Sequence, residues 1–88
     1  MKKFIQCDCC DYFTIPAEGD YEICPICFWE QDSFGIDMPS EPSGANHGLS
    51  LHEGRANFQK YGASSPEMIK NVLHESERTL YEHVARAV

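Results

Sequence analysis

The 88-residue chain has little positive charge: seven Lys and Arg residues stand against fourteen Asp and Glu residues, a formal net charge of −7. Such a surface repels the phosphate backbone of nucleic acids unless its cations gather on one face. The cations do not gather clearly and are spread along the chain, as Lys2, Lys3, Arg55, Lys60, Lys70, Arg78 and Arg86. The composition therefore disfavours a nucleic-acid-binding role.

Long hydrophobic runs are also missing. No apolar stretch approaches the roughly twenty residues of a membrane-spanning helix, so we expect no membrane association. Only two apolar residues, Phe4 and Ile5, follow the basic N-terminus before polar Gln6, which is too few for the core of a signal peptide. We therefore expect a cytoplasmic protein, and its length predicts a single domain over residues 1–88.

Cysteine, by contrast, is plentiful. Two C-x-x-C elements, Cys7-Asp8-Cys9-Cys10 and Cys24-Pro25-Ile26-Cys27, are separated by thirteen residues. In a cytoplasmic chain this arrangement is typical of zinc, because two turns that each offer a pair of thiolates fill the four corners of a tetrahedron. Such a site leaves no position open for substrate and is structural. We predict one Zn²⁺ per chain, with the ligands Cys7, Cys10, Cys24 and Cys27.

Three other residues are candidate ligands. Cys7 with Cys10 repeats the spacing of the second pair, which leaves Cys9 as a spare thiol, although a ligand set that contains Cys9 stays open. His47 and His52 are better interpreted as a polar loop residue and an exposed residue of a first helical turn, since four thiolates already complete the tetrahedron. A spare thiol next to ligands also permits a redox role, in which Cys9 attacks or exchanges.

The chain pattern predicts a small α+β fold. Residues 1–30 read as a zinc-ribbon-like antiparallel hairpin with two cysteine knuckles: a short strand at Phe4-Ile5, an aromatic and β-branched run at 12–15, a turn, and a return at 21–23. Residues 31–49 are rich in Gly, Pro and Ser and predict an irregular loop, of a length that is usually functional or pinned to the core. Two helices follow.

The helix boundaries rest on capping signals. Ser50 and Glu53 form a capping box that predicts a short helix over residues 50–62. Ser65-Pro66 predicts the start of a terminal helix over residues 65–87, with a hydroxyl cap and proline in the first turn. Helical spacing predicts one shared apolar face on that helix, made of Ile69, Val72, Leu73, Leu80 and Val84.

Large aromatic side chains flank the second knuckle and invite interpretation as a recognition surface. Core packing is the stronger interpretation of Tyr21, Phe28 and Trp29, because a small ribbon needs large side chains to cover its metal. Phe58 and Tyr61 lie three residues apart on the first predicted helix, so we expect them to dock it onto the ribbon.

The two cysteine elements and the segments around residues 19–30, 44–51 and 56–58 resemble the bacterial cysteine-rich family named for its C-P-C-C motif. Its Y-E-I-C-P-x-C-F-W-E segment is far more specific than the cysteine spacing, and the resemblance fades after Gly62. The chain departs from the family pattern at Asp8, where Pro is usual, and at Asp11, where Gly suits a positive φ angle. The resemblance implies a zinc-binding domain and no established catalytic activity.

We do not expect an enzyme, since no nucleophile and base stand out as a pair. The favoured role is a structural zinc-binding protein that acts as a protein-interaction module, including an inhibitor or immunity protein that covers a basic toxin. A nucleic-acid-binding zinc ribbon and a thiol redox or metal-responsive switch stay open as alternatives. Either partner binding or solubility explains the scattered acidic residues Glu41, Glu67, Glu75, Glu77 and Glu82.

Overall fold

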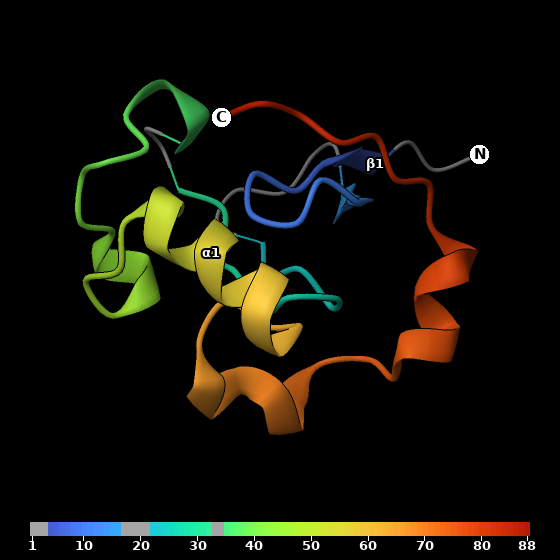
Figure 1. The fold of residues 1–88 in the computed structure, drawn as a ribbon. Helices are drawn as coiled ribbons and strands as arrows, with labels where there is room; N and C mark the ends of the chain where they lie inside the picture. Colours follow the sequence, from blue (N-terminus) through green and yellow to red (C-terminus); the bar gives the residue numbers. More distant parts are fainter. Residues whose placement is uncertain (1–3, 17–21, 33–34) are drawn as a thin grey trace.

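The computed structural model describes residues 4–16, 22–32 and 35–88 (Figure 1). Tyr21 and most of the expected turn before it lie outside these residues. The described part contains two short strands, one α-helix and several 3₁₀ helices. In chain order they are β1 (Phe4–Gln6), β2 (Phe13–Pro16), η1 (Gly35–Asp37), η2 (Gly44–Asn46), α1 (Leu51–Tyr61), η3 (Pro66–Asn71) and η4 (Glu75–Leu80). The predicted small α+β class is confirmed.

Each cysteine pair lies at the tip of its own antiparallel pairing. β1 pairs with β2, with Ile5 opposite Ile15 and an irregularity directly after Ile5, so the first knuckle closes this hairpin. The return strand expected at residues 21–23 is reduced, among described residues, to a single bridge between Ile23 and Glu30, which flanks the second knuckle. Two hairpin tips therefore face each other and can bring four sulfur atoms to one point.

The start and end of α1 follow the predicted signals. The Ser50 hydroxyl accepts a hydrogen bond from the Glu53 amide, while the Glu53 carboxylate accepts one from the Ser50 amide. Gly62 ends the helix at φ 76° and donates its N–H to the Phe58 carbonyl. Both the capping box and the glycine stop are confirmed. No helix in the described ranges has the length and apolar character needed to cross a membrane.

The core lies between α1 and the knuckles. Trp29 is 1 % exposed and packs with Ile15, Ile26 and Leu51 around the cysteines. A Cβ on Gly54 would lie 2.7 Å from the Trp29 ring, so glycine is required where the helix crosses the indole. The expected core role of Trp29 is confirmed, whereas Phe28 is only half-buried.

The two aromatic residues of α1 have different environments. Phe58 packs against the core and helps to dock the helix, as expected. Tyr61 is 38 % exposed and is not among the described side chains packed against the core, so its expected docking role is wrong. The Arg78 guanidinium lies 5.2 Å from the centre of the Phe58 ring and also donates to the Gly62 carbonyl at 3.0 Å, which holds η4 against the end of α1.

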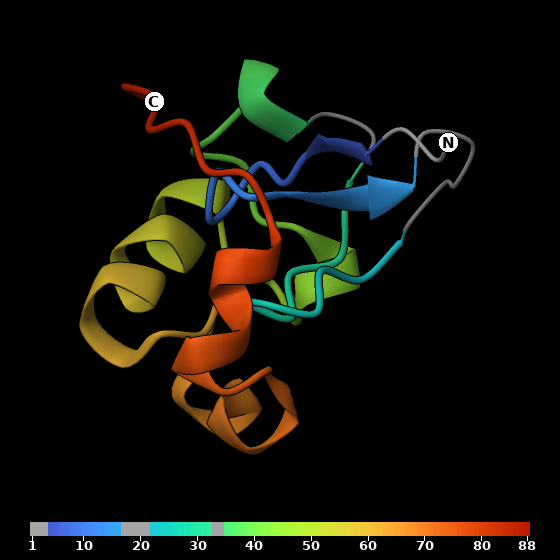
Figure 2. The ribbon, with the colours of Figure 1, turned by 90° about the vertical axis from the view of Figure 1, so that its right-hand side faces the viewer.

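The continuous terminal helix expected over residues 65–87 is wrong. The segment forms η3 and η4 with a break at 72–74, and then an extended tail that runs back along the strands (Figure 2). The apolar face expected for that helix finds little to cover it, since Leu80 is 79 % exposed and Ile69 is 49 % exposed. Helices of this kind depend on burial of one face, and here the backbone bonds to the ribbon instead.

The tail makes backbone hydrogen bonds to the first hairpin. The Phe13 amide donates to the Glu82 carbonyl at 2.9 Å, and Tyr12 and His83 form an antiparallel bridge. Farther along, the Val84 amide donates to the Asp11 carbonyl at 3.3 Å. The last residues thus cover the first knuckle, a contact between chain ends that local sequence patterns do not reveal.

Candidate metal centre

The sulfur atoms of Cys7, Cys10, Cys24 and Cys27 converge within 4.8 Å of one another, and all four side chains are buried. Two edges of this group join the knuckles: Cys7 Sγ lies 3.6 Å from Cys27 Sγ, and Cys10 Sγ lies 3.7 Å from Cys24 Sγ. A tetrahedral zinc site with metal–sulfur bonds of about 2.3 Å has sulfur–sulfur edges of about 3.8 Å. These separations are far longer than a disulfide bond of about 2.0 Å, and the cysteines are free thiols. The cluster can hold a metal ion.

The first knuckle, residues 7–12, is a tight turn closed by its own backbone. The Asp11 amide donates to the Cys7 carbonyl at 3.1 Å, and the Cys7 amide donates to the Tyr12 carbonyl at 2.8 Å. This turn requires a left-handed residue directly after the second cysteine, and Asp11 adopts φ 69°. The turn thereby directs both sulfurs, of Cys7 and Cys10, to the same side.

The second knuckle, residues 24–29, repeats the turn. The Phe28 amide donates to the Cys24 carbonyl at 2.8 Å, the Cys24 amide donates to the Trp29 carbonyl at 2.9 Å, and Phe28 adopts φ 66°. Here backbone amides also point at sulfur: the Ile26 amide donates to Cys24 Sγ at 3.3 Å, and the Trp29 amide donates to Cys27 Sγ at 3.4 Å. Such bonds stabilise a thiolate, which is the form that binds metal.

The four sulfurs cannot all be ionised without a compensating cation. Burial raises the pKa of Cys7 and of Cys27 well above the usual thiol value. The pKa of Cys10 is also raised because its thiol bonds to Cys24, and the pKa of Cys24 is lowered chiefly by that same bond. Thr14 adds a hydroxyl donor to Cys24 Sγ at 3.0 Å. A divalent ion at the centre removes this conflict because it stabilises every thiolate.

A family model of cysteine-rich CPCC proteins matches residues 5–79. The chain belongs to the cysteine-rich CPCC family. No curated protein and no solved structure matched the chain. The family unit is longer than the sequence motifs suggested, since it continues past Gly62 through both η3 and most of η4. The final tail, which contains Arg86, lies beyond the matched residues.

Asp11, the left-handed residue of the first knuckle, forms an arginine clamp, which we define as Asp11, Arg55 and Arg86. Arg55 makes a two-pronged contact, with Nη1 2.8 Å from Oδ1 and Nη2 2.8 Å from Oδ2. Arg86 donates from Nε to Oδ1 at 2.8 Å and from its backbone amide to Oδ2 at 2.9 Å. Burial disfavours the charged carboxylate, but these bonds outweigh it and lower the pKa of Asp11 to about 2.

The arginine clamp also satisfies carbonyl groups of the first knuckle. Arg86 Nη2 donates to the Cys7 carbonyl at 2.8 Å, and Arg55 Nη1 donates to the Asp8 carbonyl at 2.6 Å. Arg55 Nη2 donates to the Arg86 carbonyl at 3.0 Å, which connects α1 to the tail. Sequence reasoning treated both arginines as scattered surface cations. The one available signal was an aspartate in a turn position that favours glycine.

Asp8, where the family has proline, is held by neighbours instead of by a ring. Its amide donates to Gln31 Oε1 at 3.0 Å, and its carboxylate lies 4.0 Å from the Arg86 guanidinium. Burial raises the pKa of Asp8. The rigidity that proline would supply is therefore replaced by contacts from two other segments.

The remaining candidates lie outside the four-sulfur group. Cys9 is 2 % exposed, and its sulfur would lie 3.4 Å from a Cβ on Gly54, so it fills the contact between the knuckle and α1. His52 is exposed in the first turn of α1, and His47 is exposed in the loop. The scattered acidic residues are all exposed, but they lie on the loop, η3, η4 and the tail, and not on one helix face: Glu41, Glu67, Glu75, Glu77 and Glu82.

Proposed function

We propose that this chain is a structural zinc protein, with one Zn²⁺ bound by Cys7, Cys10, Cys24 and Cys27. The observation that carries the proposal is the closed group of four buried sulfurs from two facing knuckles. Thiolate ligands in tetrahedral arrangement favour zinc over the hard cations, and four protein ligands leave no corner for a substrate. We therefore propose a non-catalytic role, in which the metal contributes folding free energy on the order of 10 kcal/mol.

The surface supports binding of a basic protein. The formal charge is −7, and three of the seven Lys and Arg residues are engaged within the fold, since Arg55 and Arg86 bind Asp11 and Arg78 binds the end of α1. Among the described residues no arginine forms an ion pair with the exposed carboxylates, so they favour encounter with a positive surface. A basic toxin that this chain inhibits is one partner of that kind. Five thiols without a disulfide suit the reducing cytoplasm, which is the location we propose.

Two alternative functions have less support. Phosphate binding needs free cations, and the fold already uses three of the five Lys and Arg residues between positions 55 and 86, namely Arg55, Arg78 and Arg86. A redox switch needs an accessible thiol, whereas Cys9 is enclosed against α1.

Affinity capture from the native cytoplasm tests the interaction role. The zinc-loaded parent is compared with a variant that carries Gln at Glu67, Glu75, Glu77 and Glu82, and with a control variant that carries Asn71→Ser and Thr79→Ser in the same segment. We expect the parent and the control to retain one basic protein, and the Gln variant to lose it chiefly through slower association. An unchanged set of captured proteins, or the capture of none, would contradict this role.

A further inference from the structure

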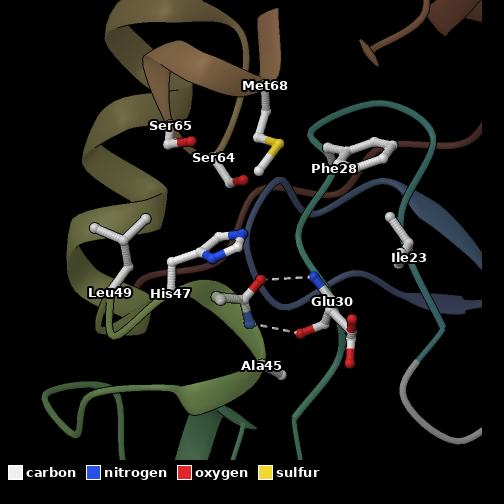
Figure 3. A pocket seen from close by; sticks show the side chains of 10 residues that line it. Ile23, Phe28, Glu30, Ala45, His47, Leu49, Ser64, Ser65 and Met68 are labelled. Carbon is white, nitrogen blue, oxygen red and sulfur yellow. Dashed lines mark hydrogen bonds between the residues drawn. The ribbon is translucent and has the colours of Figure 1, made fainter.

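A pocket of about 170 Å³ lies beside the second knuckle, and its lining contains none of the four cysteines (Figure 3). Its walls come from the knuckle, the loop that contains η2, and the start of η3. Figure 3 shows the imidazole of His47 and the thioether of Met68 directed toward the enclosed space, with the Phe28 ring on the far side. A water molecule occupies about 30 Å³ in the liquid, so this volume is that of a side-chain-sized group.

Two side chains of the pocket are held on unfavourable backbone. In the described ranges, three non-glycine residues have positive φ, and two of them, Phe28 at 66° and His47 at 60°, line this pocket. A bulky residue at such an angle is uncommon, and such residues gather at ligand clamps. The third, Asp11, occupies the same turn position in the first knuckle, where its carboxylate forms the arginine clamp. The pocket thus contains two of the three positions in the described chain where a non-glycine side chain occupies left-handed backbone.

One carboxylate, that of Glu30, belongs to the pocket lining. Asn46 fixes the Glu30 backbone, since its Oδ1 accepts from the Glu30 amide and its Nδ2 donates to the Glu30 carbonyl, both at 2.8 Å. Within the described chain the Glu30 carboxylate itself makes no hydrogen bond or ion pair, and no Lys or Arg lines the pocket. A negative group beside an aromatic face is a site for a cation.

We propose that this pocket binds an arginine side chain of a partner protein. The Phe28 ring offers its face to the guanidinium, and Glu30 supplies the opposite charge. The apolar side chains of Ile23, Leu49 and Met68 suit the methylene stem. The proposal deepens the proposed function, on which it rests for the basic character of the partner.

The probe is Nα-acetyl-arginine amide, titrated into the ¹⁵N-labelled, metal-loaded protein and followed by amide chemical shifts. The control probe is Nα-acetyl-citrulline amide, which has nearly the same shape and no charge. We expect saturable shifts at Phe28, Glu30, His47 and Ser65 with the arginine probe, and roughly tenfold weaker binding of the citrulline probe because the charge-assisted bonds are lost. Absence of saturation, equal binding of both probes, or shifts confined to other surfaces would overturn the proposal.

Matched variants separate the pocket from general charge. Glu30→Gln and Phe28→Gly should each weaken binding of the arginine probe several-fold, with the zinc content unchanged. Glu67→Gln removes the same charge outside the pocket lining and should leave the affinity close to that of the parent. Equal loss in Glu30→Gln and Glu67→Gln would contradict the site.

The failure of this proposal is distinguishable from failure of the proposed function. Saturable binding of the arginine probe together with no captured basic protein would contradict only the proposed function. A basic protein that the parent, Glu30→Gln and Phe28→Gly capture equally would contradict only the pocket. Loss of that protein in both pocket variants, but not in Glu67→Gln, is the result that we expect.

Discussion

The two knuckles form the same turn from different residues. In the second knuckle, two amides of the turn donate to its sulfurs, Trp29 directly after it enters the core, and backbone amides of Ser64 and Leu73 bond its carbonyls. In the first knuckle, charged side chains of distant segments do the corresponding work, since Arg55 of α1 and Arg86 of the tail bind Asp11 and the knuckle carbonyls. Equal sulfur geometry therefore arises once with amide–sulfur bonds inside the turn and once with an ion-pair network beside it.

This difference predicts how the two knuckles respond to substitution. The residues of the second knuckle themselves supply the turn, the amide donors and the indole, so we expect few substitutions to be accepted within residues 24–29. In the first knuckle, Asp8 and Asp11 are held by side chains of other segments. We expect mutations to reveal the same contrast.

Asp11→Ala should produce the largest change in stability among single substitutions outside the metal ligands. It leaves Arg55 and Arg86 without their shared carboxylate and keeps a side chain at positive φ, so we expect a loss of about 3 kcal/mol in the free energy of unfolding. Urea unfolding of the zinc-loaded protein measures it, and amide exchange should accelerate in the tail at Val84 and Arg86.

Asp11→Gly sharpens this prediction. Glycine removes the arginine clamp but accepts the left-handed backbone, so it should recover about 1 kcal/mol relative to Asp11→Ala. A loss below about 1 kcal/mol in Asp11→Ala would be close to that of an ordinary exposed site. It would mean that long-range contacts do not stabilise the first knuckle.

Gly54→Ala tests the second knuckle through its core contact. The added methyl group would lie 2.7 and 2.9 Å from two atoms of the Trp29 ring, which forces the helix or the indole to move. We expect a net loss of about 2 kcal/mol, because overpacking outweighs the better helix propensity of alanine. Thermal unfolding and tryptophan fluorescence would follow the change, and Ala56→Gly on the exposed face of α1 provides a control for helix propensity alone. A Gly54→Ala protein as stable as the parent would show that the close contact is not required.

Cys9→Ala should have the smallest effect. The thiol is buried as a small apolar group and lies outside the four-sulfur cluster, so zinc content should stay the same and the unfolding free energy should fall by about 1 kcal/mol or less. Elemental analysis and urea unfolding report both quantities. Loss of the metal in this variant would instead make Cys9 a ligand and require Cys10 to be reassigned.

The features that the sequence predicted well depend on neighbouring residues. Each of these features involves residues only a few positions apart. They are the capping box at Ser50 and Glu53, the helix stop at Gly62, and the two C-x-x-C turns. The arginine clamp could not be predicted in this way, because Asp11 lies 44 residues from Arg55 and 75 residues from Arg86. No short-range sequence pattern indicates a contact between residues so far apart in the chain.

The prediction of a continuous helix in the terminal segment was wrong for a related reason. Helical spacing of Leu80 and Val84 predicted an apolar face, but spacing alone does not say whether a partner surface exists. In the fold, the backbone of the last residues bonds to β2 and the first knuckle, and this contact competes with a continuous helix. The pocket beside Phe28 could likewise not be predicted from the sequence, since its walls come from three separate segments.

Zinc content is the measurement that tests the central claim most directly. Protein purified without added metal should contain one zinc per chain by elemental analysis, and Cys24→Ser should lose the metal together with the structure of both knuckles. Cys9→Ala, treated in parallel, should retain one zinc and the folded state. A zinc content well below one per chain in the parent, or a Cys24→Ser protein that keeps its full metal content and its fold, would contradict the account.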